Sequence, residues 1–132
     1  MIIGMGVDLC DARRIAATLE RFGERFSARI FTTGERARCD GRRNPAESYA
    51  RRWAAKEAAM KALGVGAFTD VRFKDLEVET LESGAPRLRL HGAAAARLAA
   101  LTPAGRAAEV HVSLTDEPPY AHAMVLIEAR PR

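Results

Sequence analysis

The chain begins with apolar residues that alternate with glycine and aspartate. The apolar positions are Ile3, Met5, Val7 and Leu9, and the positions between them are Gly4, Gly6 and Asp8. A period of two residues is typical of a β-strand, because successive side chains point to opposite faces. The pattern predicts a strand over residues 2–9, with a glycine face that carries Asp8 near its C-terminal end.

Helical patterns follow this strand. Apolar residues recur at helical spacing from Ile15 to Phe26, which predicts one amphipathic helix over residues 12–26 with arginines on its other face. Thr32 and Glu35 have the spacing of a capping box, so we expect a short helix to begin there and to end before the loop at residues 40–45.

The clearest helix is predicted over residues 46–63. Strong helix formers fill this segment without Gly or Pro, and Gly64 and Gly66 end it. Glu57 and Lys61 lie four residues apart and share one face of the helix with Trp53. This face therefore combines an acidic side chain, a cationic side chain and an aromatic ring.

The second half of the chain is richer in strand patterns. We expect strands at residues 71–80, with a bulge near Asp75, and at 86–91, then a helix at 93–101. Residues 110–115 and 120–128 form a predicted hairpin. The order is strand, three helices, two strands, helix and hairpin, which predicts an α+β fold in a single domain, residues 1–132.

Composition narrows the class of protein. The chain has 132 residues, of which 48% are hydrophobic and 29% charged, as in soluble globular domains. The two cysteines, Cys10 and Cys39, have no partner at zinc spacing and do not indicate a disulfide framework. No apolar run approaches the ~20 residues of a membrane helix, and the N-terminus lacks a basic signal peptide. We therefore expect a cytoplasmic protein without a membrane partner.

The net charge of +4 is concentrated in one half of the chain. Residues 1–66 contain 13 Lys and Arg against 8 Asp and Glu, a balance of +5, whereas residues 67–132 contain 8 against 9, a balance of −1. A basic N-terminal half favours an anionic partner, which could be nucleic acid, an acidic protein or a phosphorylated small molecule.

Each candidate for chemistry has a structural alternative. Asp8 could bind a metal ion or be solvated, and Glu57 with Lys61 could act on a phosphate or be a surface ion pair. His111 could contact an anion or be a structural histidine. The glycines after the helix could cap it or bring backbone N–H groups to a phosphate. Spacing alone leaves these alternatives open.

Taken in order, the motifs resemble a known family. They are Gly6-Val7-Asp8, Arg14-Ile15, Phe31-Thr32 with Glu35, Arg52 to Ala62 with Gly64 and Gly66, Gly84-Ala85-Pro86, and His111 to Glu117. This series, which covers about residues 2–128, is similar to the small bacterial 4'-phosphopantetheinyl transferases of the holo-[acyl-carrier-protein] synthase family. The resemblance implies an enzyme that transfers phosphopantetheine from coenzyme A to a serine of an acyl carrier protein and releases adenosine 3',5'-bisphosphate.

The resemblance also implies roles for the acid and cation on the long helix. Asp8 and Glu57 match the Mg²⁺ ligands of the family, and two carboxylates suit this hard cation. Lys61 would stabilise the leaving phosphate, and Glu57 would take the serine proton directly or through a water molecule. These three residues, Asp8, Glu57 and Lys61, are the predicted catalytic set.

Further residues are implied in binding. Those for coenzyme A are Arg52, Gly64, Gly66, Pro86 and His111. Those for the acidic carrier are Arg14, Arg21 and Arg25. The chain departs from the family at Ala85, where a cation is frequent, and Arg87 is the candidate to replace it. Family members are homotrimers with active sites between subunits, so a homotrimer is implied as well.

Two other hypotheses compete with the transferase. A basic nucleic-acid-binding module without catalysis would agree with the sequence pI of about 9.6, but the chain lacks interleaved aromatic residues and an RNA-binding signature. An inactive family member is disfavoured, because Asp8, Glu57, Lys61 and His111 are all present.

Overall fold

The long strands of the protein form one antiparallel sheet. In the computed structural model, which describes residues 1–66 and 69–132, the sheet has the order β1 (Ile2–Asp11), β5 (Tyr120–Pro131), β4 (Arg106–Glu117). The register pairs Val7 with Met124 and Val112 with Val125. β1 is therefore an edge strand, and the predicted hairpin of β4 and β5 is confirmed but longer than expected.

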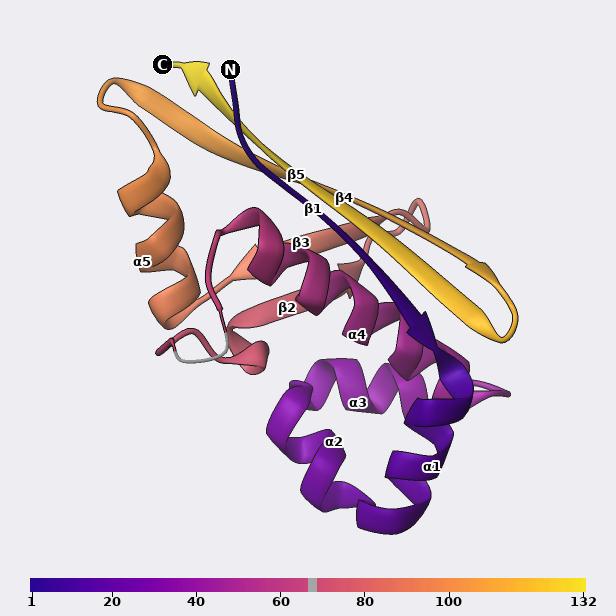
Figure 1. The fold of residues 1–132 in the computed structure, drawn as a ribbon. Coiled ribbons are helices and arrows are strands. Elements are labelled where there is room, and N and C mark those ends of the chain that lie inside the picture. Colours follow the sequence, from indigo (N-terminus) through magenta and orange to yellow (C-terminus); the bar gives the residue numbers. More distant parts are fainter. Residues whose placement is uncertain (67–68) are drawn as a thin grey trace.

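Helix α4 (Pro45–Ala62) lies along one face of this sheet (Figure 1). The glycine face of β1 packs directly on it. A Cβ atom at Gly6 would overlap the carbonyl oxygen of Ala58 and lie 2.8 Å from the nitrogen of Ala62. Only glycine allows this approach, so the glycine positions bring the backbone of β1, and with it Asp8, against the last two turns of α4.

Three helices gather near the start of α4 (Figure 1): α1 (Ala12–Phe22), α2 (Glu24–Ile30) and α3 (Thr33–Asp40). The single helix predicted over residues 12–26 was wrong. Gly23 interrupts it with a φ of 55°, a left-handed value that glycine adopts readily, and the chain turns there into α2. The predicted capping box is confirmed: Thr32 accepts from the Glu35 N–H, and Glu35 accepts from the Thr32 N–H.

A two-stranded antiparallel sheet lies on another side of α4. It consists of β2 (Leu76–Thr80) and β3 (Pro86–Leu90) and is followed by α5 (Gly92–Leu101). The predicted bulge near Asp75 was wrong, because a 3-10 turn, η1 (Phe73–Asp75), precedes β2 instead. The α+β class is confirmed, and the described residues between β1 and the β2–β3 hairpin form four α-helices rather than three.

The core lies between α4 and the inner face of the sheet, where small side chains of α4 and β5 are fully buried. The outer face is different. Met5, Leu9 and Met124 are 59%, 62% and 41% exposed. The apolar phase of β1 thus faces outward, which leaves an apolar surface across β1 and β5.

No helix within the described residues is long and apolar enough to cross a membrane.

Candidate active site

An acid and a cation meet where β1 crosses the end of α4. Lys61 donates a hydrogen bond to the carbonyl oxygen of Val7 at 3.0 Å and to Oδ1 of Asp8 at 3.1 Å. The Asp8 side chain is 16% exposed and that of Lys61 is 55% exposed. The ion pair is therefore open to solvent on the lysine side, where a ligand could approach.

Glu57 completes this cluster one helical turn before Lys61. Partial burial raises its pKa above the ordinary value, the charge of Asp8 raises it further, and Lys61 lowers it. Two carboxylates thus share a partly desolvated place with one ammonium group. A carboxylate with a raised pKa is a better proton acceptor near neutral pH, which suits a general base.

The same carboxylates fit a divalent cation. Asp8 and Glu57 offer hard oxygen donors, and their mutual repulsion, expressed in the raised pKa of Glu57, would be relieved by a bound positive charge. Neither thiol nor imidazole is part of this cluster. The donor set therefore fits Mg²⁺.

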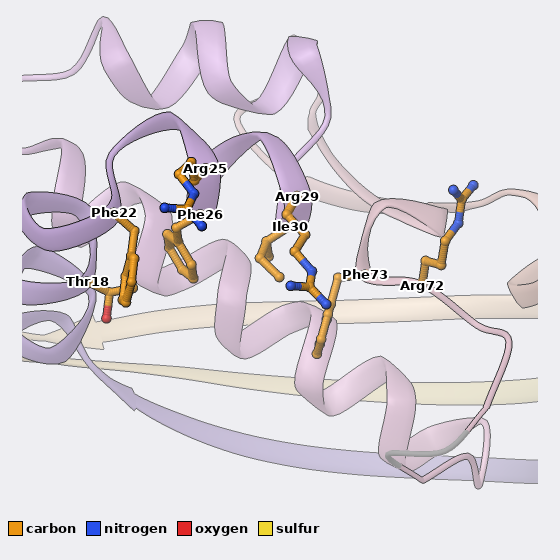
Figure 2. A pocket seen from close by; sticks show the side chains of 8 residues that line it. All are labelled: Thr18, Phe22, Arg25, Phe26, Arg29, Ile30, Arg72 and Phe73. Atoms are coloured by element: carbon orange, nitrogen blue, oxygen red, sulfur yellow. The ribbon is translucent and has the colours of Figure 1, made fainter.

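A groove lies between α1, α2 and η1 (Figure 2). Its volume is about 630 Å³, and its lining is apolar with an arginine rim: Thr18, Phe22, Phe26, Ile30 and Phe73 with Arg25, Arg29 and Arg72. Trp53 links this groove, here called the aromatic groove, to the acid cluster, because it stacks on Phe73 at 5.1 Å and shares a helix face with Glu57.

A second cavity, of about 230 Å³, lies between α3, α4 and the β2–β3 hairpin. We call it the arginine cavity, because its lining includes Arg38, Arg42, Arg51 and Arg52 beside Pro86. Arg52 is only 5% exposed, makes no ion pair among the described residues and leaves its buried Nε without a partner there. Burial lowers its pKa. A buried guanidinium without a counter-ion is a site for an anion.

Comparison with known proteins shows the family of this chain. The family model of the 4'-phosphopantetheinyl transferase superfamily matches residues 4–118. A holo-[acyl-carrier-protein] synthase from Methylobacterium radiotolerans is 64% identical over 131 residues, which cover 99% of this chain and 96% of the relative. The chain belongs to the holo-[acyl-carrier-protein] synthase family of 4'-phosphopantetheinyl transferases.

Solved structures share the fold of this transferase. The holo-[acyl-carrier-protein] synthase of Neisseria meningitidis superposes with a TM-score of 0.85 at 31% identity and covers 97% of this chain and 99% of its own. The synthase of Bacillus anthracis, solved in complex with CoA (3',5'-ADP), gives a TM-score of 0.77 at 31% identity over 98% of both chains. The predicted fold family is thereby confirmed.

The predicted coenzyme-binding residues of the transferase fall in three places. Arg52 and Pro86 meet in the arginine cavity. Gly64 follows α4 near the acid cluster, but its N–H already donates to the Lys61 carbonyl, so it acts as a helix cap. Gly66 lies two residues further on. His111 lies on the outer sheet face, where its Nε2 is 3.0 Å from Oε1 of Glu128.

The predicted carrier-binding arginines are all exposed. Arg25 lines the aromatic groove. Arg14 lies one turn before Thr18, another groove residue, and Arg21 packs against the Phe22 ring at 5.1 Å. The three arginines therefore surround one side of the groove. The groove itself was not predicted, because its far wall comes from η1, about fifty residues away in the sequence.

Other residues of the transferase escaped the sequence analysis. Arg87, the candidate to replace the missing cation at position 85, forms an ion pair with Glu79 at 3.1 Å and is not among the residues that line the arginine cavity. Arg38 and Arg42 line that cavity instead. Lys56 is completely buried and was not singled out, since nothing in a helix of strong helix formers distinguishes a buried lysine from an exposed one.

Proposed function

We propose that this transferase moves the 4'-phosphopantetheine arm of coenzyme A to a serine hydroxyl of an acyl carrier protein and releases adenosine 3',5'-bisphosphate. The observation that carries the proposal is the cluster of Asp8, Glu57 and Lys61 in a chain of this family. The cluster combines two carboxylates, one with a raised pKa, with a solvent-accessible ammonium group. Activation of a hydroxyl beside a diphosphate requires these groups.

Each residue of the cluster has a separate role in the reaction. Asp8 and Glu57 would hold Mg²⁺, which when bound neutralises negative charge on the diphosphate. Glu57, directly or through a water molecule, accepts the proton of the attacking serine hydroxyl as the serine oxygen forms a bond to the phosphorus that carries the pantetheine arm. The bond from this phosphorus to the oxygen of the adenosine bisphosphate breaks. Lys61 exchanges its contact with Asp8 for the leaving phosphate and neutralises the charge that develops there.

The nucleotide end of coenzyme A would occupy the arginine cavity. Arg52 is buried there and has no counter-ion within residues 1–66 and 69–132, and Arg38 and Arg42 add positive charge at its border. Charge-assisted bonds from guanidinium groups recognise phosphate with defined geometry. Arg52 and Pro86 are thus proposed to bind coenzyme A, as the sequence predicts, and the arginines of the cavity supply the charge that Ala85 lacks.

The aromatic groove would receive the carrier. Its rim is cationic, with Arg25 and Arg29 free of ion pairs among the described residues, and its floor is apolar. An acidic helical protein that inserts apolar side chains complements both properties. Trp53 stacks on Phe73 of the groove and lies one helical turn before Glu57, so a docked carrier would extend its serine along this face of α4 toward the reacting phosphate. Arg14 and Arg21 extend the positive surface along α1.

The assembly would be a homotrimer in the cytoplasm. Arg52 and Glu57 are five residues apart on α4, so they face directions about 140° apart around the helix. The arginine cavity and the acid cluster of one chain therefore open on different sides. A neighbouring chain packed on the exposed apolar face of β1 and β5 would bring its own residues, His111 among them, to the site.

The transfer activity of two single variants, D8A and E57A, tests this proposal. Apo carrier, coenzyme A and Mg²⁺ are incubated with wild type, D8A or E57A, and transfer is followed by the mass of the carrier. We expect both variants to fold, to bind the carrier and to lose transfer by at least about 100-fold. Full activity in either variant would contradict the assignment. Salt-dependent binding of nucleic acid that coenzyme A does not affect would favour the competing module.

A further inference from the structure

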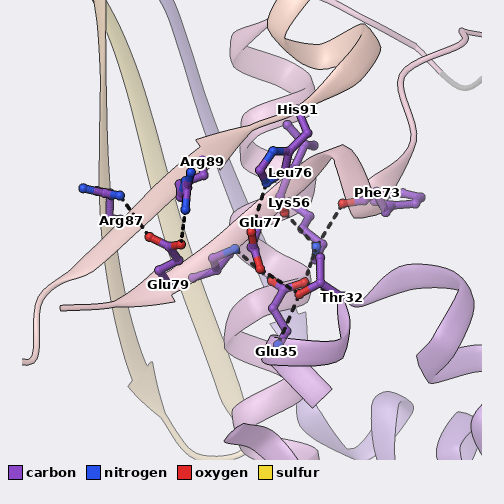
Figure 3. Close-up of polar contacts among 11 residues, drawn as sticks. Thr32, Glu35, Lys56, Phe73, Leu76, Glu77, Glu79, Arg87, Arg89 and His91 are labelled. Atoms are coloured by element: carbon purple, nitrogen blue, oxygen red, sulfur yellow. Dashed lines mark hydrogen bonds and ion pairs between the residues drawn. The ribbon is translucent and has the colours of Figure 1, made fainter. Parts of the chain in front are cut away.

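One ion pair lies entirely inside the protein, between α4 and α3 (Figure 3). The side chains of Lys56 and Glu35 have no exposed surface. Nζ of Lys56 donates to Oε1 of Glu35 at 2.8 Å, to the carbonyl oxygen of Phe73 at 2.9 Å and to that of Leu76 at 2.7 Å. Burial lowers the pKa of Lys56, and Glu35 opposes this effect. Each ammonium hydrogen has an acceptor, which holds the charged form in place.

Glu35 extends these contacts to two further backbone groups. It accepts a hydrogen bond from the Thr32 N–H at 2.9 Å and from the Val78 N–H at 2.9 Å. The pair therefore joins the start of α3, the middle of α4 and residues 73–78. A buried ion pair adds little stability compared with apolar side chains of similar volume, so the effect of this pair lies in the hydrogen bonds by which it joins these three segments.

The segment held in this way forms one wall of the aromatic groove. Phe73 accepts from Lys56 through its carbonyl oxygen, while its ring lines the groove and stacks on Trp53. The opposite wall is α2, with Phe26. Lys56 itself lies outside the groove lining. Its bond to the Phe73 backbone thus fixes how far η1 stands from α2.

We propose that Lys56 is a positioning residue that holds the Phe73 wall of the aromatic groove at the separation the carrier protein requires. The inference rests on the proposed function, because it takes the groove as the docking surface for the carrier. Lys56 touches neither coenzyme A nor the carrier. Loss of the Lys56 ammonium group should therefore weaken carrier binding and leave coenzyme A binding unchanged. A general loss of stability would not affect one substrate selectively.

The test uses K56M, which replaces the ammonium by an apolar group of similar length, and K56M/E35Q, which removes both charges. Steady-state kinetics are measured separately for carrier and coenzyme A. We expect the KM for carrier to rise about tenfold in the folded double variant and the KM for coenzyme A to stay within about twofold. Trp53 is the single tryptophan of the chain, so its emission should also shift as the Phe73 ring moves away.

Y49F is the matched control. Tyr49 is buried on α4 and donates to the exposed Asp40 of α3 at 2.7 Å, so the substitution removes a partly buried polar contact between the same helices, and neither residue lines the groove. We expect Y49F to lower stability without changing the ratio of the two KM values. A folded K56M/E35Q with the wild-type KM for carrier, or with equal rises in both KM values, would overturn the inference.

F73L separates this inference from the proposed function. It alters the wall and leaves the Lys56 contacts intact, so we expect the same selective rise in the KM for carrier. If F73L has this effect and K56M/E35Q does not, the positioning role is wrong and the docking groove stands. If neither F73L nor R25E changes the KM for carrier, the groove is not the docking surface. If both Lys56 variants fail to fold, an unchanged KM for carrier in F73L still overturns the inference.

Discussion

Gly6→Ala tests how closely β1 must approach α4. The added Cβ would overlap the carbonyl oxygen of Ala58 and lie 2.9 Å from the Cβ of Lys61. An ordinary contact between carbon and oxygen is about 3.3 Å or longer, so the strand must move outward by about 1 Å. Asp8 lies two residues further along the same face of β1, and it would move with the strand.

The displacement has two measurable consequences. The bonds from Lys61 to the Val7 carbonyl and to Asp8, now 3.0 and 3.1 Å, would stretch to roughly 4 Å, beyond hydrogen-bonding distance. Overpacking of this kind costs about 1–3 kcal/mol of unfolding free energy. A misplacement of about 1 Å at the reacting groups reduces transfer by about 100-fold. Urea denaturation gives the first quantity, and initial rates of transfer give the second.

Gly34→Ala is the control. Gly34 is exposed on α3, and an added Cβ would meet no described atom nearer than Oε2 of Glu77 at 3.7 Å. Alanine in this helix should raise the unfolding free energy by up to about 1 kcal/mol and leave transfer unchanged. If G6A were as stable and as active as wild type, the argument that the glycine face positions Asp8 would be refuted.

Three further predictions concern the surface and the pH dependence. M124E places a charge on the exposed apolar face of β1 and β5, where we propose that the subunits of the trimer meet. Light scattering after size-exclusion chromatography should therefore show a monomer, and a trimer of unchanged stability would contradict this subunit interface. R25E should raise the KM for an acidic carrier by about tenfold at low salt, less at high salt, with coenzyme A binding unchanged; an effect independent of salt would contradict electrostatic docking. Hydrogen bonds from His91 and Thr32 lower the pKa of Glu77, so its contribution to stability is fully present above the ordinary value of 4.5 and is lost as the pH falls through the lowered pKa; E77Q should destabilise the protein at pH 7 and progressively less as the pH falls below 4.5, and a loss of stability independent of pH would contradict this role of Glu77.

Local pattern predicted most of the elements. Period two located β1, and the capping box located α3, because both depend on neighbouring residues. The break at Gly23 was missed, because Phe22 and Phe26 keep helical spacing across it even though Phe22 is 44% exposed. The 3-10 turn at residues 73–75 was missed too, since its backbone is held by Lys56, a contact across the fold.

The site was predicted only in part, because sequence spacing shows contacts between neighbouring residues and not contacts across the fold. Glu57 and Lys61 lie one turn apart, so their common face follows from the helix alone, and Asp8 joined them through the resemblance to the family. Arg38 and Arg42, which share the cavity with Arg52, come from α3 and the loop before α4, and sequence spacing carries no signal for this approach. The outward direction of Met5 and Leu9 was also hidden, because alternation does not say which face of a strand is covered.

The most direct test of the central claim is the intact mass of an apo acyl carrier protein after incubation with this transferase, coenzyme A and Mg²⁺. The account predicts a gain of one phosphopantetheine arm per carrier, prevented by EDTA and by E57A. A carrier of unchanged mass, in the presence of folded protein that binds both coenzyme A and carrier, would contradict it.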